Sequence, residues 1–167
     1  MTPYRMDDYE HAFAEHRLEA PAAFNFGADV VDAWARDPSK LALIWCDAVG
    51  NERRLTFDDV ARASNRVANR LAARGVVKGD RVVVMLPRIP EWQIALTACL
   101  KLGAIPIPCI TMLTERDVAY RVRHSGAVAS ITLSGETGKF AGAAAFKVRI
   151  AIGPSCAGWE TLSLIHI

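Results

Sequence analysis

Residues 79–108 constrain the fold more than any other part of this sequence. A turn at Gly79 leads into the β-branched run 82–86, which is followed by an apolar helix-forming run that Pro90 opens and Gly103 closes. A second apolar run follows almost at once. The order of strand, helix and strand with so few spare residues is typical of a βαβ unit.

Both ends of this helix follow from backbone chemistry. Pro90 suits the first helical position because its missing N–H would lack an intrahelical partner there, and Gly103 suits the left-handed residue after the last turn. We therefore expect a helix over about 90–102, and its scarce polar side chains predict burial on most sides. The run 82–86 has no polar alternation, which favours a strand covered on both faces in the middle of a sheet.

Composition excludes several classes of protein. The 167 residues are 51% hydrophobic, as in a folded domain, and the formal charge of +2 provides no basic surface for nucleic acid. The four cysteines lie far apart without a metal-ligand spacing, and no stretch has the apolar length of a transmembrane segment. We expect a cytoplasmic protein without a metal site or a nucleic-acid partner.

Capping signals place two further helices. Thr56 with Asp59, and Thr114 with Asp117, have the spacing of an Asp form of the capping box. The other expected elements are helices over 6–18, 27–34 (anchored by Trp34) and 140–146, a hairpin over 41–56, and strands over 128–133 and 147–152. The alternation predicts an α/β fold with an incomplete, mostly parallel sheet and helices on both faces.

Two features resemble ligand-binding sites. For both, the plainer interpretation, which is surface structure without a ligand, is favoured. Arginine recurs every four residues in the predicted helix, at Arg62, Arg66, Arg70 and Arg74. A helix in a globular domain needs a solvated face, and this stripe has no interleaved aromatic side chains that would stack on nucleic-acid bases. Residues 134–139 end in Gly-Lys but have two residues between their glycines, where a phosphate-binding loop needs four. We predict a surface turn there, with a contact between Lys139 and a ligand phosphate as the alternative.

The order of several motifs carries a family resemblance. The motifs are Leu-Thr-Phe-Asp-Asp-Val at 55–60, Gly-Asp-Arg-Val at 79–82, Leu-Pro-Arg-Ile-Pro-Glu-Trp at 86–92 and Leu-Lys-Leu-Gly-Ala at 100–104. In this order and spacing the chain resembles the opening of adenylate-forming acyl-CoA synthetases. Phe24-Asn25-Phe26 and Gly158-Trp159 make it most similar to the medium-chain branch.

The resemblance implies a reaction in two steps. ATP and a carboxylic acid, medium-chain fatty or aromatic, give an acyl-adenylate with release of pyrophosphate, and the acyl group then passes to CoA, with Mg²⁺ accompanying the ATP. The family's phosphate loop, nucleotide-binding motifs and catalytic lysine would lie beyond residue 167. We therefore expect no catalytic residue in this chain and an inactive, truncated synthetase; the alternative is a non-catalytic nucleotide- or CoA-binding module.

The resemblance assigns one site residue and a division of the chain. The medium-chain branch has a CoA-contacting glutamine where Met112 stands here, so Met112 is the candidate CoA-binding position. We expect a peripheral segment over 1–23 and a partial AMP-binding domain over 24–161. The family pattern predicts a helix after Trp159, but residues 162–167, Leu-Ser-Leu-Ile-His-Ile, match a translated sequencing adapter, with a genuine exposed strand as the alternative. Acyl-chain length and oligomeric state have no signal in the sequence.

Overall fold

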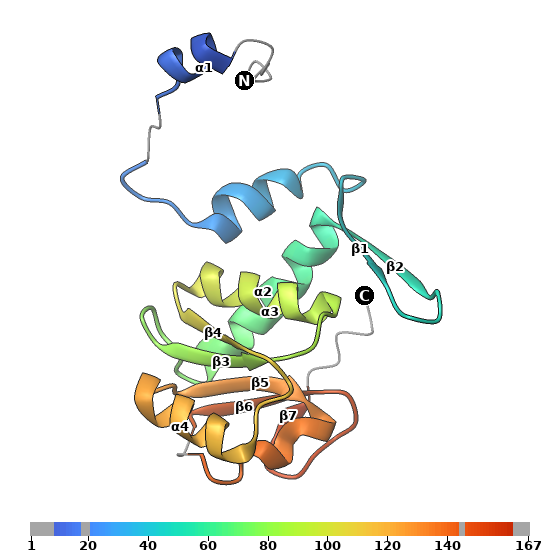
Figure 1. Ribbon diagram of the computed structural model, residues 1–167, viewed down its shortest axis with the longest axis vertical. Coiled ribbons are helices and arrows are strands. Elements are labelled where there is room, and N and C mark those ends of the chain that lie inside the picture. The colour runs from blue at the N-terminus through green and yellow to red at the C-terminus, as the bar shows by residue number, and fades with distance from the viewer. Residues whose placement is uncertain (1–8, 18–20, 144–145, 162–167) are drawn as a thin grey trace.

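A five-stranded parallel sheet forms the centre of the computed structural model, which describes residues 9–17, 21–143 and 146–161. The strands are β3 (Arg81–Met85), β4 (Ile105–Cys109), β5 (Ala129–Leu133), β6 (Val148–Ile152) and β7 (Glu160–Thr161), in the order β4-β3-β5-β6-β7. All four neighbouring pairs are parallel, which confirms the expected sheet (Figure 1). The predicted strands over 128–133 and 147–152 match β5 and β6.

The βαβ unit has the predicted form. Helix α3 (Pro90–Leu102) begins at Pro90 and ends at Gly103, whose φ of 71° is left-handed. The N–H of Ile105 donates to the carbonyl oxygen of Asp80 at 2.8 Å. Because alternate residues of a strand point their N–H groups to opposite sides, Pro106 and Pro108 face the outer side of β4, where no donor is needed.

Helices cover both faces of the sheet and divide the core in two (Figure 1). Helices α2 (Phe57–Ala73) and α3 pack against each other over one face, where the larger cluster contains Val82, Val84 and Ile131. Helix α4 (Glu115–Ser125) and the 3-10 helix Ser134–Phe140 cover the other face, over Val83 and Met85. Helices on both faces are the predicted arrangement.

Both predicted capping boxes are present. The Thr56 hydroxyl accepts from the Asp59 N–H at 3.2 Å, and the Asp59 carboxylate accepts from the Thr56 N–H at 2.9 Å. Thr114 and Asp117 repeat this exchange at the start of α4, at 3.3 and 3.0 Å. Each box satisfies two N–H groups that the first helical turn leaves without partners.

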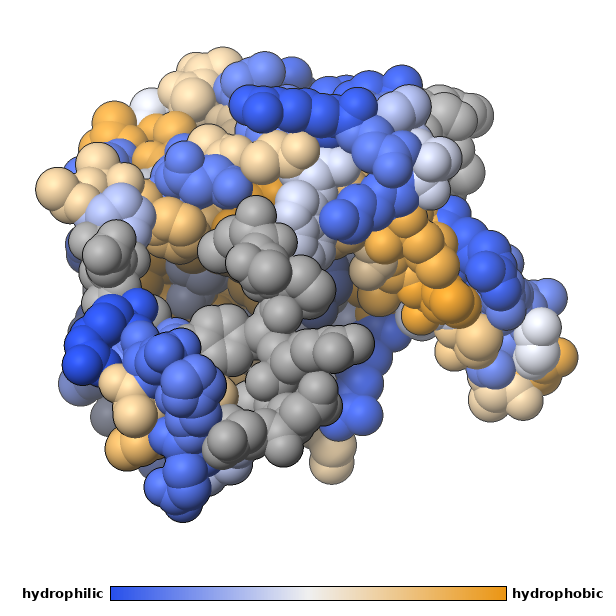
Figure 2. Space-filling model, turned by 90° about the horizontal axis from the view of Figure 1, so that it is seen from above, coloured by the Kyte–Doolittle hydropathy of each residue, from blue (hydrophilic) through white to orange (hydrophobic). Residues whose placement is uncertain are grey.

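The predicted hairpin forms a separate two-stranded sheet. Strands β1 (Leu41–Cys46) and β2 (Glu52–Thr56) pair antiparallel and extend to the right of the helices in Figure 1. Seen from above, this arm carries hydrophobic side chains at the surface (Figure 2), and Ile44 and Val49 are among its exposed residues. The hairpin therefore presents apolar surface outside the main sheet.

Three expectations about local structure need correction. The helix over 140–146 is wrong: the turn of helix lies earlier, at Ser134–Phe140, because Phe140 is buried in the core while Gly142 is in a turn. Residues 134–139 are thus a 3-10 helix and not a simple turn. The chain after Trp159 forms the short strand β7 where the family pattern predicted a helix.

The N-terminal helices are partly as predicted. Helix α1 (Tyr9–Glu15) has no buried residue and lies apart from the other elements in Figure 1. Segment Phe26–Asp32 winds as a π-helix and buries Gly27 and Val31. Trp34 is 47% exposed and packs edge to face on Phe57 at the start of α2, so Gly27 and Val31, and not Trp34, are the buried residues of this segment. The proposed adapter at 162–167 lies outside the described residues.

Within the described ranges, no helix is both long and apolar enough to span a bilayer.

Asn25 links the π-helix Phe26–Asp32 to the end of α3. Its side-chain oxygen accepts from the N–H of Gly27 at 2.9 Å, and its side-chain nitrogen donates to the carbonyl oxygens of Leu100 and Lys101 at 2.9 and 3.2 Å. The Lys101 amine in turn forms an ion pair with Asp32 at 2.5 Å. These contacts satisfy backbone groups at both helix ends.

We predict that Gly27→Ala destabilises the chain through one defined contact. A Cβ at position 27 would lie 2.2 Å from Cγ of Lys101, so we expect a loss of about 1–3 kcal/mol in the free energy of unfolding. In a Lys101→Ala background the added penalty should shrink, because Cγ is gone. Urea unfolding measures all four members of the cycle.

Gly135→Ala is the matched control for this cycle, because nothing lies within 4 Å of the Cβ that it would add. Its effect should stay within about 0.5 kcal/mol. Equal penalties for Gly27→Ala with and without Lys101 would contradict the steric account.

The capping boxes predict a loss of stability in acid. Hydrogen bonding from the Thr56 N–H lowers the pKa of Asp59, and hydrogen bonding with Thr114 lowers the pKa of Asp117, both below the usual 3.8. A carboxyl group whose pKa is lower in the folded than in the unfolded chain adds to the free energy of unfolding. This contribution is complete at pH values above the pKa of the unfolded chain, and it is lost as the pH falls through the pKa of the folded chain. Asp59→Asn should therefore reduce the drop in urea midpoint between pH 6 and pH 3, and adding Asp117→Asn should reduce it further. An unchanged drop would refute this assignment.

Candidate functional site

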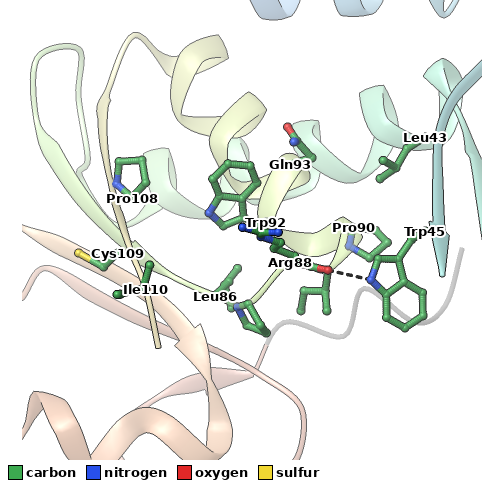
Figure 3. Close-up of a pocket in the computed structure, with 12 residues that line it drawn as sticks. Leu43, Trp45, Leu86, Arg88, Pro90, Trp92, Gln93, Pro108, Cys109 and Ile110 are labelled. Atoms are coloured by element: carbon green, nitrogen blue, oxygen red, sulfur yellow. Dashed lines mark hydrogen bonds between the residues drawn. The ribbon is translucent and has the colours of Figure 1, made fainter. Parts of the chain in front are cut away.

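A concave site lies at the carboxyl ends of β3 and β4. It is a cavity of about 530 Å³, which we call the strand-end cavity. It is lined by Leu43 and Trp45 of β1, residues 86–90, Trp92 and Gln93 of α3, and residues 108–110 (Figure 3). The connection after β3 runs to α3 on one face, and the connection after β4 runs to α4 on the other. Open α/β sheets commonly bind ligands at such a switch point.

Two polar contacts hold the hairpin against this site. The indole N–H of Trp45 donates to the carbonyl oxygen of Arg88 at 2.7 Å, drawn as a dashed line in Figure 3. The guanidinium of Arg53 pairs with the carboxylate of Glu91 at 2.8 Å. Glu91 is only 4% exposed, so this ion pair neutralises a buried charge in the first turn of α3.

The cavity wall is apolar apart from its rim. Among the lining residues Arg88 is the one with a charged side chain, and Gln93 adds an exposed amide. In the described part of the chain Arg88 forms no ion pair. Sequence reasoning did not assign these residues to a site, although their place directly after a buried strand was the available signal.

The cavity has no activated nucleophile. Burial raises the pKa of the Cys109 thiol, and the nearby Arg121 only partly opposes this shift. Burial also raises the pKa of Cys99, on α3, to about 12. Because the thiolate is the reactive form of cysteine, both thiols act as small hydrophobic groups at neutral pH.

Met112 lies beyond the cavity, in the loop between β4 and α4. Its side chain is 86% exposed and is not among the cavity's lining residues. The amine of Lys139 donates to the carbonyl oxygen of the neighbouring Thr111 at 2.5 Å and pairs with Glu136. The structure therefore brings the end of the Gly-Lys segment to the Met112 loop, a proximity that sequence spacing did not reveal.

The arginine stripe of α2 is solvated and ion-paired, which confirms the plainer interpretation. Arg62 pairs with Asp58 and Asp59 at 3.1 and 3.2 Å. Arg70 and Arg74 both pair with Glu160 and so attach β7 to α2. Three of the four arginines thus have carboxylate partners.

Within the described residues, no group of three His, Cys, Asp or Glu side chains is placed to hold a metal ion.

Comparison with known proteins decides the family. The family described as AMP-binding enzyme matches residues 30–156, which is most of the chain and includes the whole strand-end cavity. The chain belongs to this family. Its βαβ unit and its hairpin therefore lie within the part of the chain that matches this family.

Acyl-CoA synthetases of mammals are among its relatives. The chain is 38% identical over 138 residues to mitochondrial acyl-coenzyme A synthetase ACSM3 of Homo sapiens, covering 78% of this chain and 24% of the relative. It is 39% identical over 123 residues to mitochondrial acyl-coenzyme A synthetase ACSM5 of Homo sapiens, covering 70% and 21%. The resemblance to this branch is confirmed.

Solved structures agree on the fold. An acyl-CoA synthetase of Brucella canis matches with a TM-score of 0.76 and 26% identity, over 91% of this chain and 29% of that chain. Acetoacetyl-CoA synthetase of Streptomyces lividans matches with a TM-score of 0.71 and 22% identity, over 83% and 24%. The second match bears on the fold alone.

The matches cover only part of each relative. The chain spans about a quarter of the length of the curated relatives it matches. Their names place those relatives in mitochondria, and the cytoplasmic location expected here stays a prediction.

The ion pair beside the cavity makes a testable contribution to stability. Arg53→Met should lower the free energy of unfolding by about 1–3 kcal/mol, because it leaves the buried Glu91 carboxylate without its cation. The double variant Arg53→Met/Glu91→Leu should lose less than Arg53→Met alone, since no buried charge remains. Urea unfolding of the wild-type chain, Arg53→Met, Glu91→Leu and the double variant tests this, and a double variant that loses the sum of the two single losses would contradict it.

Proposed function

We propose that this chain is the amino-terminal portion of an AMP-forming acyl-CoA synthetase. The protein would activate a medium-chain fatty or aromatic carboxylic acid with ATP and transfer the acyl group to CoA. The observation that carries the proposal is the 38% identity to a mammalian acyl-coenzyme A synthetase over 78% of the chain. The family match over residues 30–156 includes the βαβ unit and the hairpin that build the strand-end cavity.

The chain's contribution to this reaction is a scaffold. Adenylation requires a weak carboxylate nucleophile to be positioned against the α-phosphorus while donors neutralise phosphate charge. Burial raises the pKa of the Cys109 thiol at the cavity, and the described residues offer no group of acids placed to hold Mg²⁺. We therefore assign ATP and Mg²⁺ binding to residues outside this chain, and residues 24–161 to one part of the AMP-binding domain behind the peripheral segment 1–23.

The Met112 loop is the proposed point of contact with CoA. Met112 is exposed at the carboxyl edge of the sheet, where a ligand can reach it. Lys139, whose amine donates to the carbonyl oxygen of Thr111, lies beside it, with its charge paired to Glu136. Methionine cannot donate the hydrogen bonds of the glutamine that the medium-chain branch has here, so contact at Met112 would be apolar.

Isotope exchange tests the proposed reaction. The longer protein that contains this chain should incorporate labelled pyrophosphate into ATP only when octanoate, benzoate or a similar acid is present, and the 167-residue chain alone should show no exchange. No exchange with any straight-chain or aromatic acid would refute the proposal.

The same experiment separates the alternative of a non-catalytic module. In that case CoA or a nucleotide would raise the melting temperature, by the linkage of binding to folding, without any exchange.

A further inference from the structure

Strand β1 has a free outer edge. It forms a sheet of two strands with β2, and no other described strand pairs with its second side (Figure 1). The N–H of Asp47 donates to the carbonyl oxygen of Asn51 at 3.0 Å, which turns it toward the side of β2. Because alternate residues of a strand point their N–H groups to opposite sides, those of Ile44 and Cys46 point outward. The outer edge therefore offers backbone donors and acceptors to another strand.

This edge lacks the features that protect the other sheet edges of the described chain. Strand β4 carries two prolines, β2 has three charged residues in succession, and β7 has only two residues. Strand β1 reads Leu-Ala-Leu-Ile-Trp-Cys, without charge or proline, and Leu41 and Ile44 are 44% and 46% exposed. An apolar, uncharged edge strand is a template for pairing with another chain.

The charges at the two ends of β1 complement those of a second copy. Lys40 precedes the strand and Asp47 follows it, and neither forms an ion pair among the described residues. Hydrogen bonding with Asn51 lowers the pKa of Asp47, so this carboxylate is charged at neutral pH. If two copies of β1 pair antiparallel, the positive end of each lies beside the negative end of the other. A parallel pair would bring like charges together.

We propose that two copies of this chain pair through the outer edges of β1, antiparallel and related by a two-fold axis. The pair forms a four-stranded sheet in the order β2-β1-β1-β2. The new outer edges are then the charged β2 strands, so association stops at two copies. The pairing also removes part of the exposed Ile44 side chain from water in both copies. It needs no substrate and is independent of the proposed function.

Sedimentation velocity of the 167-residue chain tests the pairing. We expect a monomer–dimer equilibrium that shifts toward the dimer between about 1 and about 200 µM, without larger species. Cys46 is exposed on the same strand, so the measurement is made with a reductant that excludes a disulfide between the copies. A chain that stays monomeric throughout, or one that grows into larger species, would overturn the proposal.

A charge on the edge should block the pairing. Ile44→Lys places one positive charge from each copy at the junction, so the dissociation constant should rise at least about tenfold. Ile105→Lys is the matched control, because Ile105 is 50% exposed and lies on β4, the edge strand that carries prolines. It should leave the constant within about twofold. Melting temperatures report whether both variants fold, and equal weakening by the two would refute the edge.

Reversal of the end charge tests the antiparallel arrangement. Lys40→Glu places a negative charge beside Asp47 of the other copy, so the dissociation constant should rise about fivefold at low salt. Lys78→Glu makes the same change of charge at an exposed position before β3 and should have little effect. Equal effects of the two substitutions would contradict antiparallel pairing.

Hydrogen exchange of the unmodified chain identifies what covers the edge. The outward amides of Ile44 and Cys46 should exchange faster on dilution, as the dimer dissociates, whereas that of Asp47, bonded to Asn51, should not change. Fast exchange of Ile44 at every concentration would overturn the proposal. So would slow exchange that does not depend on concentration, because another segment of the same chain would then cover the edge.

Discussion

The rest of the structure depends on the burial of β3 on both faces. Val82 and Val84 point into the core beneath α2 and α3, while Val83 and Met85 point into the core beneath α4. Because side chains alternate along a strand, one five-residue segment belongs to two hydrophobic clusters at once. Its neighbours β4 and β5 satisfy its backbone on both edges. A shift of one residue would exchange the two faces, so this strand sets the register of the parallel sheet.

Local chemistry explains why much of the fold could be predicted from the sequence. The bounds of α3 follow from Pro90 and Gly103, and the starts of α2 and α4 follow from Thr56 and Thr114, because each signal acts within one helical turn. Contacts between distant residues could not be read in this way. Asn25 binds the end of α3, Glu160 receives two arginines of α2, and Phe140 is buried where an alanine-rich helix was expected. The strand-end cavity is of the same kind, because its walls meet only after the hairpin folds back.

Residues that mark the family have structural tasks in this chain. Asn25 joins two helices, Gly103 ends α3 in a left-handed conformation, and Pro106 and Pro108 remove donors from the outer side of β4. The missing donors make that edge a poor template for pairing with another strand. A motif can therefore identify an enzyme family while its residues serve the scaffold.

The hairpin connects this scaffold to the strand-end cavity. Strand β1 reaches the carboxyl end of β3 through Trp45, and β2 reaches the start of α3 through Arg53, so the two strands fix both sides of the loop that carries Arg88. The ion pair with Arg53 neutralises Glu91, the acidic residue in the first turn of α3. Arg88 remains as the positive group beside an apolar cavity. Contacts on both sides of this loop therefore hold in place the wall that it contributes to the strand-end cavity.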